Sequence, residues 1–444
     1  MRQWMVAAKK ADFYAIAEKF HVDPVVARII RNREVIGEKN IRIYLGGNLS
    51  DLSDPHQMKD MDRLVEILAQ KIRKQAHIRI IGDYDVDGVT SSHLFLTALR
   101  RVGAKVDVVI PHRIQDGYGL SLHLLQQAKE DGVDTILTCD NGIAAIDEIA
   151  WAKAQKMTVL VTDHHAVPFE EHEGRRTEKK SLADAVVNPH QQDCRYPYKE
   201  LCGAGVAWNV IRVLYENYDM DKREAEDLLD FVAMATVCDV MSLTGENRIL
   251  VKEGLKRIRH TKNIGLQALM QACNVQPENI SAYHFGYVLG PCVNATGRLD
   301  TARHALRLFE TGQETEAEEI ARDLVDLNQE RKELTLQGVE MAKKLCEEGG
   351  YENDPVLVLF LPDVHESIAG LIAGRIREMY NRPVFVLTRG EEGVKGSGRS
   401  TENYSMYENM CGCAELFTKF GGHPMAAGLS LPEENVEKFR RKIN

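Results

Sequence analysis

The sequence of 444 residues contains no apolar run long enough to cross a bilayer, and we expect no secretory leader at its start. Its nine cysteines form no CxxC pair. The closest spacing is Cys411-Gly412-Cys413, which we interpret as two incidental thiols. An odd and unpatterned set of cysteines disfavours a disulfide framework, so we expect a protein of the reducing cytoplasm. Internal repeats and low-complexity tracts are also missing.

Basic residues are fewer than acidic ones, which gives a net charge of −10. This balance argues against a sequence-blind coat on nucleic acid, because such proteins are strongly basic. It is compatible with a local basic groove, since acids clustered at a metal site raise the negative count. A hydrophobic content of 44% and a mean hydropathy of −0.30 are ordinary for a globular protein. The length predicts two or three domains with cores of their own.

Strands and helices are predicted to alternate between residues 77 and 190. Short apolar runs predict the strands, and amphipathic stretches predict the helices between them. The alternation is typical of an α/β fold with a doubly wound, mainly parallel sheet, in which ligands bind at the carboxyl ends of the strands. The predicted strands are 77–82, 105–110, 134–139, 157–162 and a weaker one at 184–187, and the predicted helices are 88–101, 121–130 and 143–155.

Three carboxylates follow the first predicted strand on alternate residues: Asp83, Asp85 and Asp87. Asp87 can be explained as the cap of the helix that opens at Gly88. A cap explains one acid and not three. Carboxylates crowded at a strand end repel each other unless cations lie between them, so the stretch favours a site for hard divalent metal. Asx-turn and EF-hand-like runs are the alternatives.

The same chemistry recurs where two later strands end. Asp140 follows the strand at 134–139, and Asp163-His164-His165 follows the strand at 157–162. A single aspartate after a strand is more often a cap or a turn former, and a solvated pair is the alternative for the histidines. Adjacent imidazoles point to different sides, so one can bind metal while its neighbour meets substrate. Three strand ends with acid or imidazole therefore favour one shared site.

Asp239 ends an apolar stretch within a helix predicted at 224–240. A carboxylate at the end of a buried run must be paired or bound to metal. The carboxyl end of a helix disfavours negative charge, so a nearby cation is the better explanation.

The remaining segments carry weaker signals. Two glycine-rich stretches, Gly396–Ser400 and Phe420–Gly428, combine Ser, Arg and His with turn-forming glycines and suggest a phosphate cradle. Asn294–Arg298 is expected to interrupt a helical region with a turn that exposes Arg298. Further helices are predicted at 10–20, 24–33, 61–73, 203–217, 246–310, 314–348 and 367–379, further strands at 355–361 and 383–388, and an exposed charged loop at 169–181.

In combination these residues resemble the DHH phosphoesterase superfamily, and the glycine-rich C-terminal part is similar to its DHHA1 domain. Within the superfamily the sequence is most similar to the RecJ family of single-strand-specific 5′→3′ DNA exonucleases. The resemblance covers about residues 40 to 444 and rests on these stretches: Gly82–Gly88, Asp116–Leu120, Asp163–His165, Leu201–Gly205, Asn294–Arg298, Gly398–Ser400 and Gly421–His423.

The resemblance implies a site for two divalent ions, Mn²⁺ or Mg²⁺. Asp85 and Asp140 would hold one ion, and Asp140 would also help to hold the second. His165 would face the scissile phosphate, with Asp83 at the edge of the site. The other implied ligands of the second ion are Asp87, His164 and Asp239, and the implied substrate contacts are Arg113, Ser397 and Arg399 on the 5′-phosphate, Arg298 on the strand backbone, and Gly422 and His423.

Two features depart from the family pattern. Many superfamily members carry a histidine ligand where this sequence has Ile81, which weakens the first metal site or leaves Asp83 to compensate. Longer family members continue into a nucleic-acid-binding OB domain, so we expect this chain to be a truncated form or a short variant. The expected domains are a helical and loop segment (1–60), the DHH catalytic domain (61–310), a long connecting helix (311–348) and a smaller α/β DHHA1 substrate-binding domain (349–444).

The expected reaction is hydrolysis of a phosphodiester, since no Ser or Cys nucleophile with a base partner is evident. Tyr283, Phe285 and Tyr287 are candidates for base stacking, but their alternate spacing fits core packing as well. The alternative functions are cleavage of short oligonucleotides or cyclic dinucleotides, and silent binding of single strands. We expect a monomer that acts on single-stranded DNA with a 5′ end, with a helicase and single-strand-binding protein as candidate partners.

Overall fold

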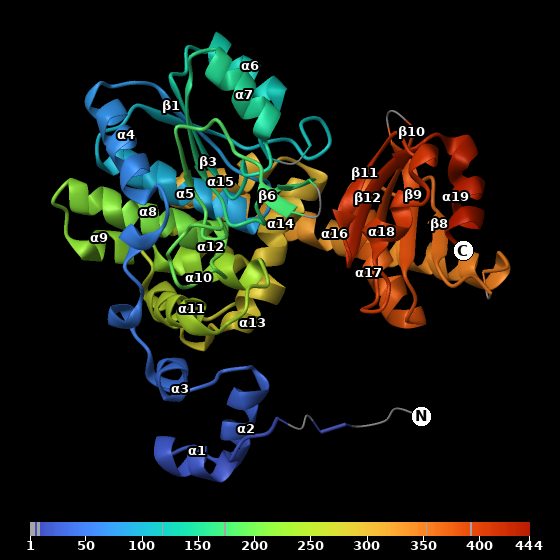
Figure 1. The fold of residues 1–444 in the computed structure, drawn as a ribbon, viewed down its shortest axis with the longest axis horizontal. Coiled ribbons are helices and arrows are strands. Elements are labelled where there is room, and N and C mark those ends of the chain that lie inside the picture. Colours follow the sequence, from blue (N-terminus) through green and yellow to red (C-terminus); the bar gives the residue numbers. More distant parts are fainter. Residues whose placement is uncertain (1–4, 7–8, 118, 173–174, 352, 391–392) are drawn as a thin grey trace. The chain divides into compact units, whose positions relative to one another are not determined.

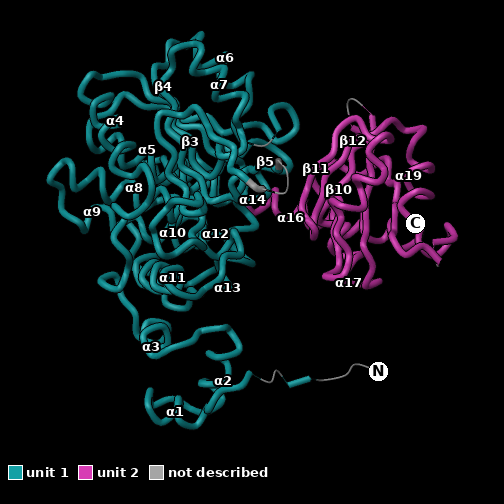
Figure 2. Tube along the Cα trace, in the orientation of Figure 1, with its two compact units in different colours: residues 1–324 teal, residues 325–444 magenta. Residues whose placement is uncertain are grey.

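The computed structural model describes residues 1–444 except 1–4, 7–8, 118, 173–174, 352 and 391–392. The chain forms two compact units, Met1–Leu324 and Val325–Asn444, which Figure 2 shows in different colours. Among the described residues, no helix combines the length and the apolar character that crossing a membrane requires.

The first unit is built on a five-stranded parallel sheet with the order β2-β1-β3-β4-β7, of which Figure 1 labels β1 and β3. Ile81 at the end of β1 pairs with Val109 on one side and with Thr138 on the other. The strand order reverses between β1 and β3, which makes their carboxyl ends the switch point of the sheet. The predicted doubly wound parallel sheet is therefore confirmed, with β1 at Ile78–Ile81, β2 at Val106–Val109, β3 at Thr135–Cys139, β4 at Thr158–Thr162 and β7 at Ala185–Val187.

Helices cover both faces of this sheet. Helices α6 (Leu122–Glu130) and α7 (Ile146–Ala154) pack their apolar residues on one face. Helix α8 (Gly203–Asn217) lies on the other face, in contact with both α4 (Met61–Arg73) and α5 (Val86–Arg101).

Helix α5 is buried for most of its length, because α8 and α10 (Leu229–Cys238) cover the side that the sheet leaves open. Its buried hydroxyl groups donate hydrogen bonds to carbonyl oxygens one turn back, from Thr90 to Val86 and from Ser92 to Gly88, each at 2.7 Å. Polar side chains can occupy this buried helix because their hydrogen bonds are satisfied within it.

The other elements of the first unit are mostly helical. The helix predicted at 224–240 is two helices, α9 (Lys222–Glu226) and α10, and the predicted charged loop 169–181 contains a hairpin of β5 (Phe169–His172) and β6 (Arg175–Glu178). Residues 173–174 of that loop lie outside the described residues. The remaining helices are α1 (Phe13–Phe20), α2 (Pro24–Asn32), α3 (Glu38–Gly46), α11 (Gly245–Arg257), α12 (Ile264–Ala272), α13 (Ala282–His284), α14 (Gly290–Leu299) and α15 (Ala302–Glu310).

The turn expected at Asn294–Arg298 is wrong, because these residues lie inside α14. A Cβ atom on Gly297 would come within 2.3 Å of the carbonyl oxygen of Tyr84, so the glycine lets the helix pass directly over the acid-bearing loop. Glycine here serves close packing between backbones rather than a turn.

The second unit is a smaller α/β domain whose sheet has the order β11-β12-β10-β9-β8. Only β8 and β9 pair in parallel, and the other described pairs are antiparallel. Its elements are most of α16 (Glu314–Glu348), β8 (Leu357–Phe360), α17 (Ala369–Tyr380), β9 (Val384–Gly390), β10 (Gly393–Arg399), α18 (Met406–Cys411), β11 (Lys419–His423), β12 (Ala426–Leu431) and α19 (Val436–Ile443).

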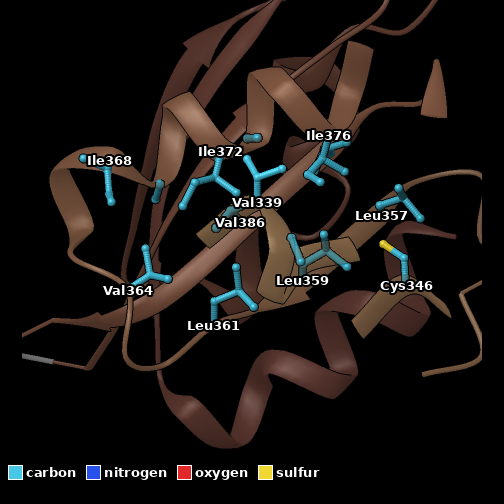
Figure 3. Close-up of a cluster of buried hydrophobic side chains, with 14 of the residues drawn as sticks. Val339, Cys346, Leu357, Leu359, Leu361, Val364, Ile368, Ile372, Ile376 and Val386 are labelled. Carbon is cyan, nitrogen blue, oxygen red and sulfur yellow. The ribbon is translucent and has the colours of Figure 1, made fainter. Parts of the chain in front are cut away.

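The carboxyl half of α16 belongs to the core of this second unit. Val339 and Cys346 point from α16 toward Ile372 of α17 and Leu359 of β8, as Figure 3 shows. A Cβ atom on Gly338 would lie 2.3 Å from Cδ1 of Ile372, so the glycine permits the close approach of α16 and α17. The long helix is therefore more than a solvated spacer, because it contributes one layer of this core.

Candidate metal centre

The loop after β1 brings Asp83, Asp85 and Asp87 to the start of α5. A Cβ atom on Gly88 would lie 2.4 Å from the carbonyl oxygen of Asp83, so the loop is folded tightly onto the first turn of the helix. The cap of α5 is Asp85, whose carboxylate accepts a hydrogen bond from the amide of Gly88 at 3.0 Å. The assignment of this cap to Asp87 is wrong.

Asp87 is held by a different helix. Its two carboxylate oxygens accept hydrogen bonds from the amides of Gly203 at 2.6 Å and Ala204 at 2.8 Å, at the start of α8. The amino end of a helix favours a negative charge. A Cβ atom on Gly203 would lie 2.6 Å from Cβ of Asp140, so only glycine lets α8 approach both acids.

Asp140 follows β3 in a left-handed conformation with φ of 62°. The side-chain amide of Asn141 donates hydrogen bonds to the carbonyl oxygens of Ile81 at 3.0 Å and Cys139 at 2.9 Å. Asn141 therefore ties the ends of β1 and β3 together and fixes Asp140 beside the loop that carries the first three acids.

His164 is a point of contact between acids from three elements. Its Nε2 atom lies 3.1 Å from Oδ1 of Asp140, 3.6 Å from Oδ2 of Asp239 and 3.7 Å from Oδ2 of Asp87. Asp239 stands at the carboxyl end of α10 as its cap. Burial lowers the pKa of His164, which favours the neutral imidazole that acts as a metal ligand.

The imidazole of His165, unlike that of His164, has its closest contact with Asp163. Its Nδ1 atom lies 2.8 Å from Oδ1 of Asp163, and the side chain is half-buried. Asp163 is fully buried and also accepts hydrogen bonds from the amides of Ile143 at 2.9 Å and His164 at 2.7 Å. Although burial lowers it, the carboxylate of Asp163 raises the pKa of His165 to about 9.

The acids and imidazoles form two neighbouring ligand sets, which a third group of residues connects. Asp83, Asp85 and Asp140 form one set, in which one oxygen from each residue lies within 4.8 Å of the others. The same distance joins the ligand atoms of Asp87, His164 and Asp239. Asp140 belongs to the first set and also groups with His164 and His165, so it lies between the two sets.

The electrostatics of the cluster require positive charge. Burial and neighbouring carboxylates raise the pKa of Asp83 and Asp140 well above the usual value, and the same causes raise the pKa of Asp239 to about 8. Oδ1 of Asp83 is buried and has no hydrogen-bond partner among the described residues. Buried acids at this density ionise together only when cations neutralise them. Oxygen-rich sets with one imidazole suit Mn²⁺ or Mg²⁺, so the residues present fit such ions.

Ile81, which stands where many superfamily members have a histidine ligand, is fully buried in β1. It offers no ligand atom. The carboxylate of Asp83 lies within the first ligand set, so compensation by Asp83 stays a prediction.

Two arginines border the acid loop in the first unit. Nε of Arg113 donates a hydrogen bond to the carbonyl oxygen of Gly297 at 2.9 Å, and its guanidinium lies 3.9 Å from the ring centre of Tyr84. Arg298 follows at the end of α14. The side chain of Asn294 accepts a hydrogen bond from the amide of Val86 at 3.1 Å, so α14 is fastened to the loop that both arginines flank.

The other predicted substrate contacts lie in the second unit. Ser397 and Arg399 are neighbours on one face of β10, and a Cβ atom on Gly370 of α17 would lie 2.8 Å from Nη2 of Arg399 and 2.9 Å from Oγ of Ser397. Burial and the charge of Arg377 lower the pKa of Arg399, which favours an anionic partner for this guanidinium.

Gly422 and His423 are exposed at the end of β11. Most residues of the glycine-rich stretches lie in strands β10, β11 and β12 rather than in turns. The phosphate cradle that the sequence suggested stays a prediction.

Sequence reasoning missed the positioning roles of Asp163 and Asn141. The signal for Asp163 is its place directly before two histidines. The signal for Asn141 is a side-chain amide directly after a strand, where it can bridge neighbouring strand ends.

Comparisons with known proteins identify two family domains in the chain. Residues 77–236 match the DHH family, N-terminal domain, and residues 353–444 match the DHHA1 domain. The chain is 36% identical over 439 residues to the single-stranded-DNA-specific exonuclease RecJ of Haemophilus influenzae, covering 95% of this chain and 74% of that protein. It is 34% identical over 432 residues to the Bacillus subtilis protein of the same name, covering 97% of this chain and 53% of that protein.

The fold also matches a solved structure, that of RecJ in complex with Mn²⁺ from Thermus thermophilus. The TM-score is 0.81 at 29% identity, over 97% of this chain and 60% of that one. The chain thus spans between about half and three quarters of the length of these relatives.

Proposed function

The chain belongs to the RecJ family of single-stranded-DNA-specific exonucleases, and from this premise we propose that it hydrolyses single-stranded DNA from the 5′ end with two divalent metal ions. The observation that carries the proposal is the pair of neighbouring ligand sets at the switch point of the parallel sheet. A cluster of buried acids with one buried imidazole has little structural use of its own, because it costs folding free energy unless cations are bound.

The residues that would hold the ions follow from the two sets. Asp85 and Asp140, with Asp83 beside them, would hold one ion. Asp87, Asp140, His164 and Asp239 would hold the other. Two such ions, when bound, supply an activated water at neutral pH and neutralise charge on the attacking and leaving oxygens of the phosphodiester.

His165 would act on the substrate itself. Asp163 fixes the imidazole through Nδ1, so the ring presents Nε2 as its other polar atom. We assign this nitrogen to a non-bridging oxygen of the scissile phosphate, where it donates a hydrogen bond that strengthens as charge develops. Asp163 is therefore a positioning residue, because it acts through His165.

Specificity for a 5′ end would come from cationic side chains that bind a terminal phosphate. Arg113 uses Nε on Gly297, which leaves its two terminal nitrogens for an anion. Ser397 and Arg399 offer a hydroxyl and a guanidinium on β10 of the second unit. The exposed Gly422 and His423 lie on β11 of the same sheet, with β12 between the two strands. Arg298 would contact the strand backbone. Guanidinium groups suit phosphate because they bind it through two parallel hydrogen bonds.

A monomer suffices for this activity, since one chain supplies every residue named above. All nine cysteines are thiols outside any disulfide, which supports a reducing cytoplasm as the site of action. A helicase that separates duplex DNA would supply the single strand, and single-strand-binding protein would cover the same strand.

A labelled oligonucleotide tests the proposal. A strand with a 5′-phosphate is labelled at either end and digested with Mn²⁺, with Mg²⁺ or with chelator. We expect the 5′ label to appear first as mononucleotide while the 3′ label stays on long products, with turnover abolished by chelator. Asp140→Asn should lose turnover, whereas the exposed Asp193→Asn should not. Release of the 3′ label first, or full activity in chelator, would overturn the proposal.

A further inference from the structure

Three aromatic residues, for which the sequence allows either core packing or base stacking, differ in their exposure to solvent. Phe285 is fully buried, whereas Tyr283 is 63% exposed and Tyr287 is 72% exposed. The two tyrosine rings stack on each other, with centroids 5.1 Å apart and planes inclined by 26°. Phe285 is thus a core residue, and the tyrosines form a pair of aromatic faces on the surface, which we call the tyrosine pair.

The backbone beneath the tyrosine pair is unusual. Residues Phe285–Leu289 form a π-helical turn, η5, between α13 and α14. Such turns are rare and are frequent at functional sites. Here the turn lets Phe285 enter the core while Tyr283 and Tyr287 remain in solvent.

The same helical run connects the tyrosine pair to the metal centre. Residues 282–299 are helical throughout, as α13, η5 and α14. The carbonyl oxygen of Phe285 accepts a hydrogen bond from Sγ of Cys238 at 3.3 Å, and Cys238 precedes Asp239 in the chain. At the other end of the run, Asn294 is bonded to the amide of Val86 in the acid loop.

We propose that the tyrosine pair stacks with bases of the single strand at a distance from the metal centre, on the same helical run that presents Arg298 to the strand backbone. The inference rests on the proposed function, because the strand must pass the metal centre to reach this surface. Exposed rings suit a strand of any sequence, since every base has a face to stack on.

Helical geometry sets the reach of this contact. Arg298 is eleven positions after Tyr287, which at about 1.5 Å per residue is roughly 16 Å of helix. That length corresponds to about five nucleotides at the 3.4 Å spacing of one strand in B-DNA. On this spacing, a strand of three nucleotides with its 5′ end at the metal centre would end before the tyrosine pair, and a strand of twelve would pass it.

Base stacking would add affinity that the net negative charge of the chain does not supply. With a net charge of −10, the whole protein gains little from nonspecific attraction to phosphate. Aromatic stacking adds affinity for unpaired bases without positive charge, and duplex DNA offers no free base faces to such a surface.

Binding of fluorescently labelled oligothymidylates of 3 and 12 nucleotides, both with a 5′-phosphate, tests the inference. Fluorescence anisotropy is measured in EDTA at fixed salt, so that no strand is cleaved. The variants are the double substitution Tyr283→Ala with Tyr287→Ala, the conservative double substitution to Phe, and Tyr14→Ala as a control, because Tyr14 is 77% exposed on α1.

We expect the double alanine variant to bind the 12-nucleotide strand at least about tenfold more weakly and the 3-nucleotide strand as the parent does. The phenylalanine variant and Tyr14→Ala should bind both strands as the parent does. In Mn²⁺ the double alanine variant should raise KM for the long strand and leave kcat unchanged.

Unchanged affinity for the 12-nucleotide strand would overturn the inference and leave the tyrosine pair as a surface for a protein partner. An equal loss for both strands would also overturn it, because the defect would then lie at the metal centre. A parent protein that binds the long strand but never cleaves it in Mn²⁺ would refute the proposed function alone, since stacking is measured without metal.

Discussion

Nδ1 of His165 lies 2.8 Å from Oδ1 of Asp163. Asp163 belongs neither to the ligand set that contains Asp85 nor to the set that contains Asp239. Asp163 thus orients the imidazole of His165, whereas the neighbouring acids form the candidate ligand sets.

Asp163→Asn should lower kcat by roughly 10²- to 10⁴-fold with little change in KM, because the amide cannot hold the imidazole in the same protonation state and orientation. Steady-state kinetics on a 12-nucleotide strand measure both constants. Thermal unfolding and Mn²⁺ binding of the variant serve as controls for folding. A kcat close to the parent value would contradict the positioning role.

Metal binding should stabilise the fold. The acids of the centre repel one another when ionised, and an ion that binds only the folded chain adds about 2.7 kcal/mol at a concentration roughly one hundred times its dissociation constant. We expect Mn²⁺ to raise the melting temperature of the parent by on the order of 5 °C. Differential scanning fluorimetry measures this shift.

The same titration of Asp140→Asn should show little or no shift, because the residue lies between the two ligand sets. Asp193→Asn, at the surface, is the matched control and should respond as the parent does. An equal shift in both variants would place the metal elsewhere.

Two helical glycines predict opposite effects of alanine. A Cβ atom on Gly88 of α5 would lie 2.4 Å from the backbone of Asp83, whereas a Cβ atom on Gly374 of α17 meets no described atom within 4 Å. Gly88→Ala should destabilise the first unit by roughly 1–3 kcal/mol and disrupt metal binding. Gly374→Ala should stabilise the second unit by about 0.5–1 kcal/mol, because alanine is the better helix former. Urea unfolding measures both, and destabilisation of similar size in the two variants would contradict the steric argument.

The stability of the first unit should depend on pH through Asp107, which is not part of the metal centre. Nε and Nη2 of the buried Arg79 donate to its two oxygens at 2.8 and 2.7 Å. Burial raises the pKa of Asp107, but these hydrogen bonds outweigh it and lower the pKa overall. A carboxyl whose pKa is lower in the folded chain adds stability above its unfolded pKa of about 3.9, and this stability is lost as the pH falls through the folded value.

Asp107→Asn should therefore lower the free energy of unfolding at neutral pH by about 1 kcal/mol, given that the carboxylate is partly exposed, and the difference from the parent should shrink below about pH 4. Asp131→Asn is the matched control, because Asp131 also accepts from Arg79 but is more exposed. Chemical unfolding of the three proteins, from neutral pH down to about pH 3, measures the effect. A constant difference across this range would refute the assignment.

The sequence predicts that these acids come together, because they follow buried strands and the carboxyl ends of parallel strands meet at one edge. Asp83, Asp140 and Asp163 could each be placed by that rule alone. The cap of α5 could not be predicted in this way. The carboxylate of Asp87 accepts hydrogen bonds from the amides of Gly203 and Ala204, which are far from it in the sequence.

The glycine stretches show why other predictions failed. Gly396 and Gly398 lie inside β10 because side chains from other elements fill the space above them: a Cβ atom there would come within 2.4 Å of Leu387 and of Met406, respectively. Glycine is locally typical of turns, and only these distant neighbours make it necessary in a strand. The same holds for the helix at Asn294–Arg298, because the backbone of Tyr84 lies too close to Gly297 for any residue with a Cβ atom.

The left-handed backbone at Asp140 restricts which residues can replace it in evolution. Glycine, asparagine and aspartate tolerate such a conformation, whereas most other residues are strained in it. A change to asparagine removes the charge and keeps the shape, so a chain that has lost this candidate metal ligand can keep the folded scaffold. Loss of the ligand set without loss of the fold is thus one substitution away.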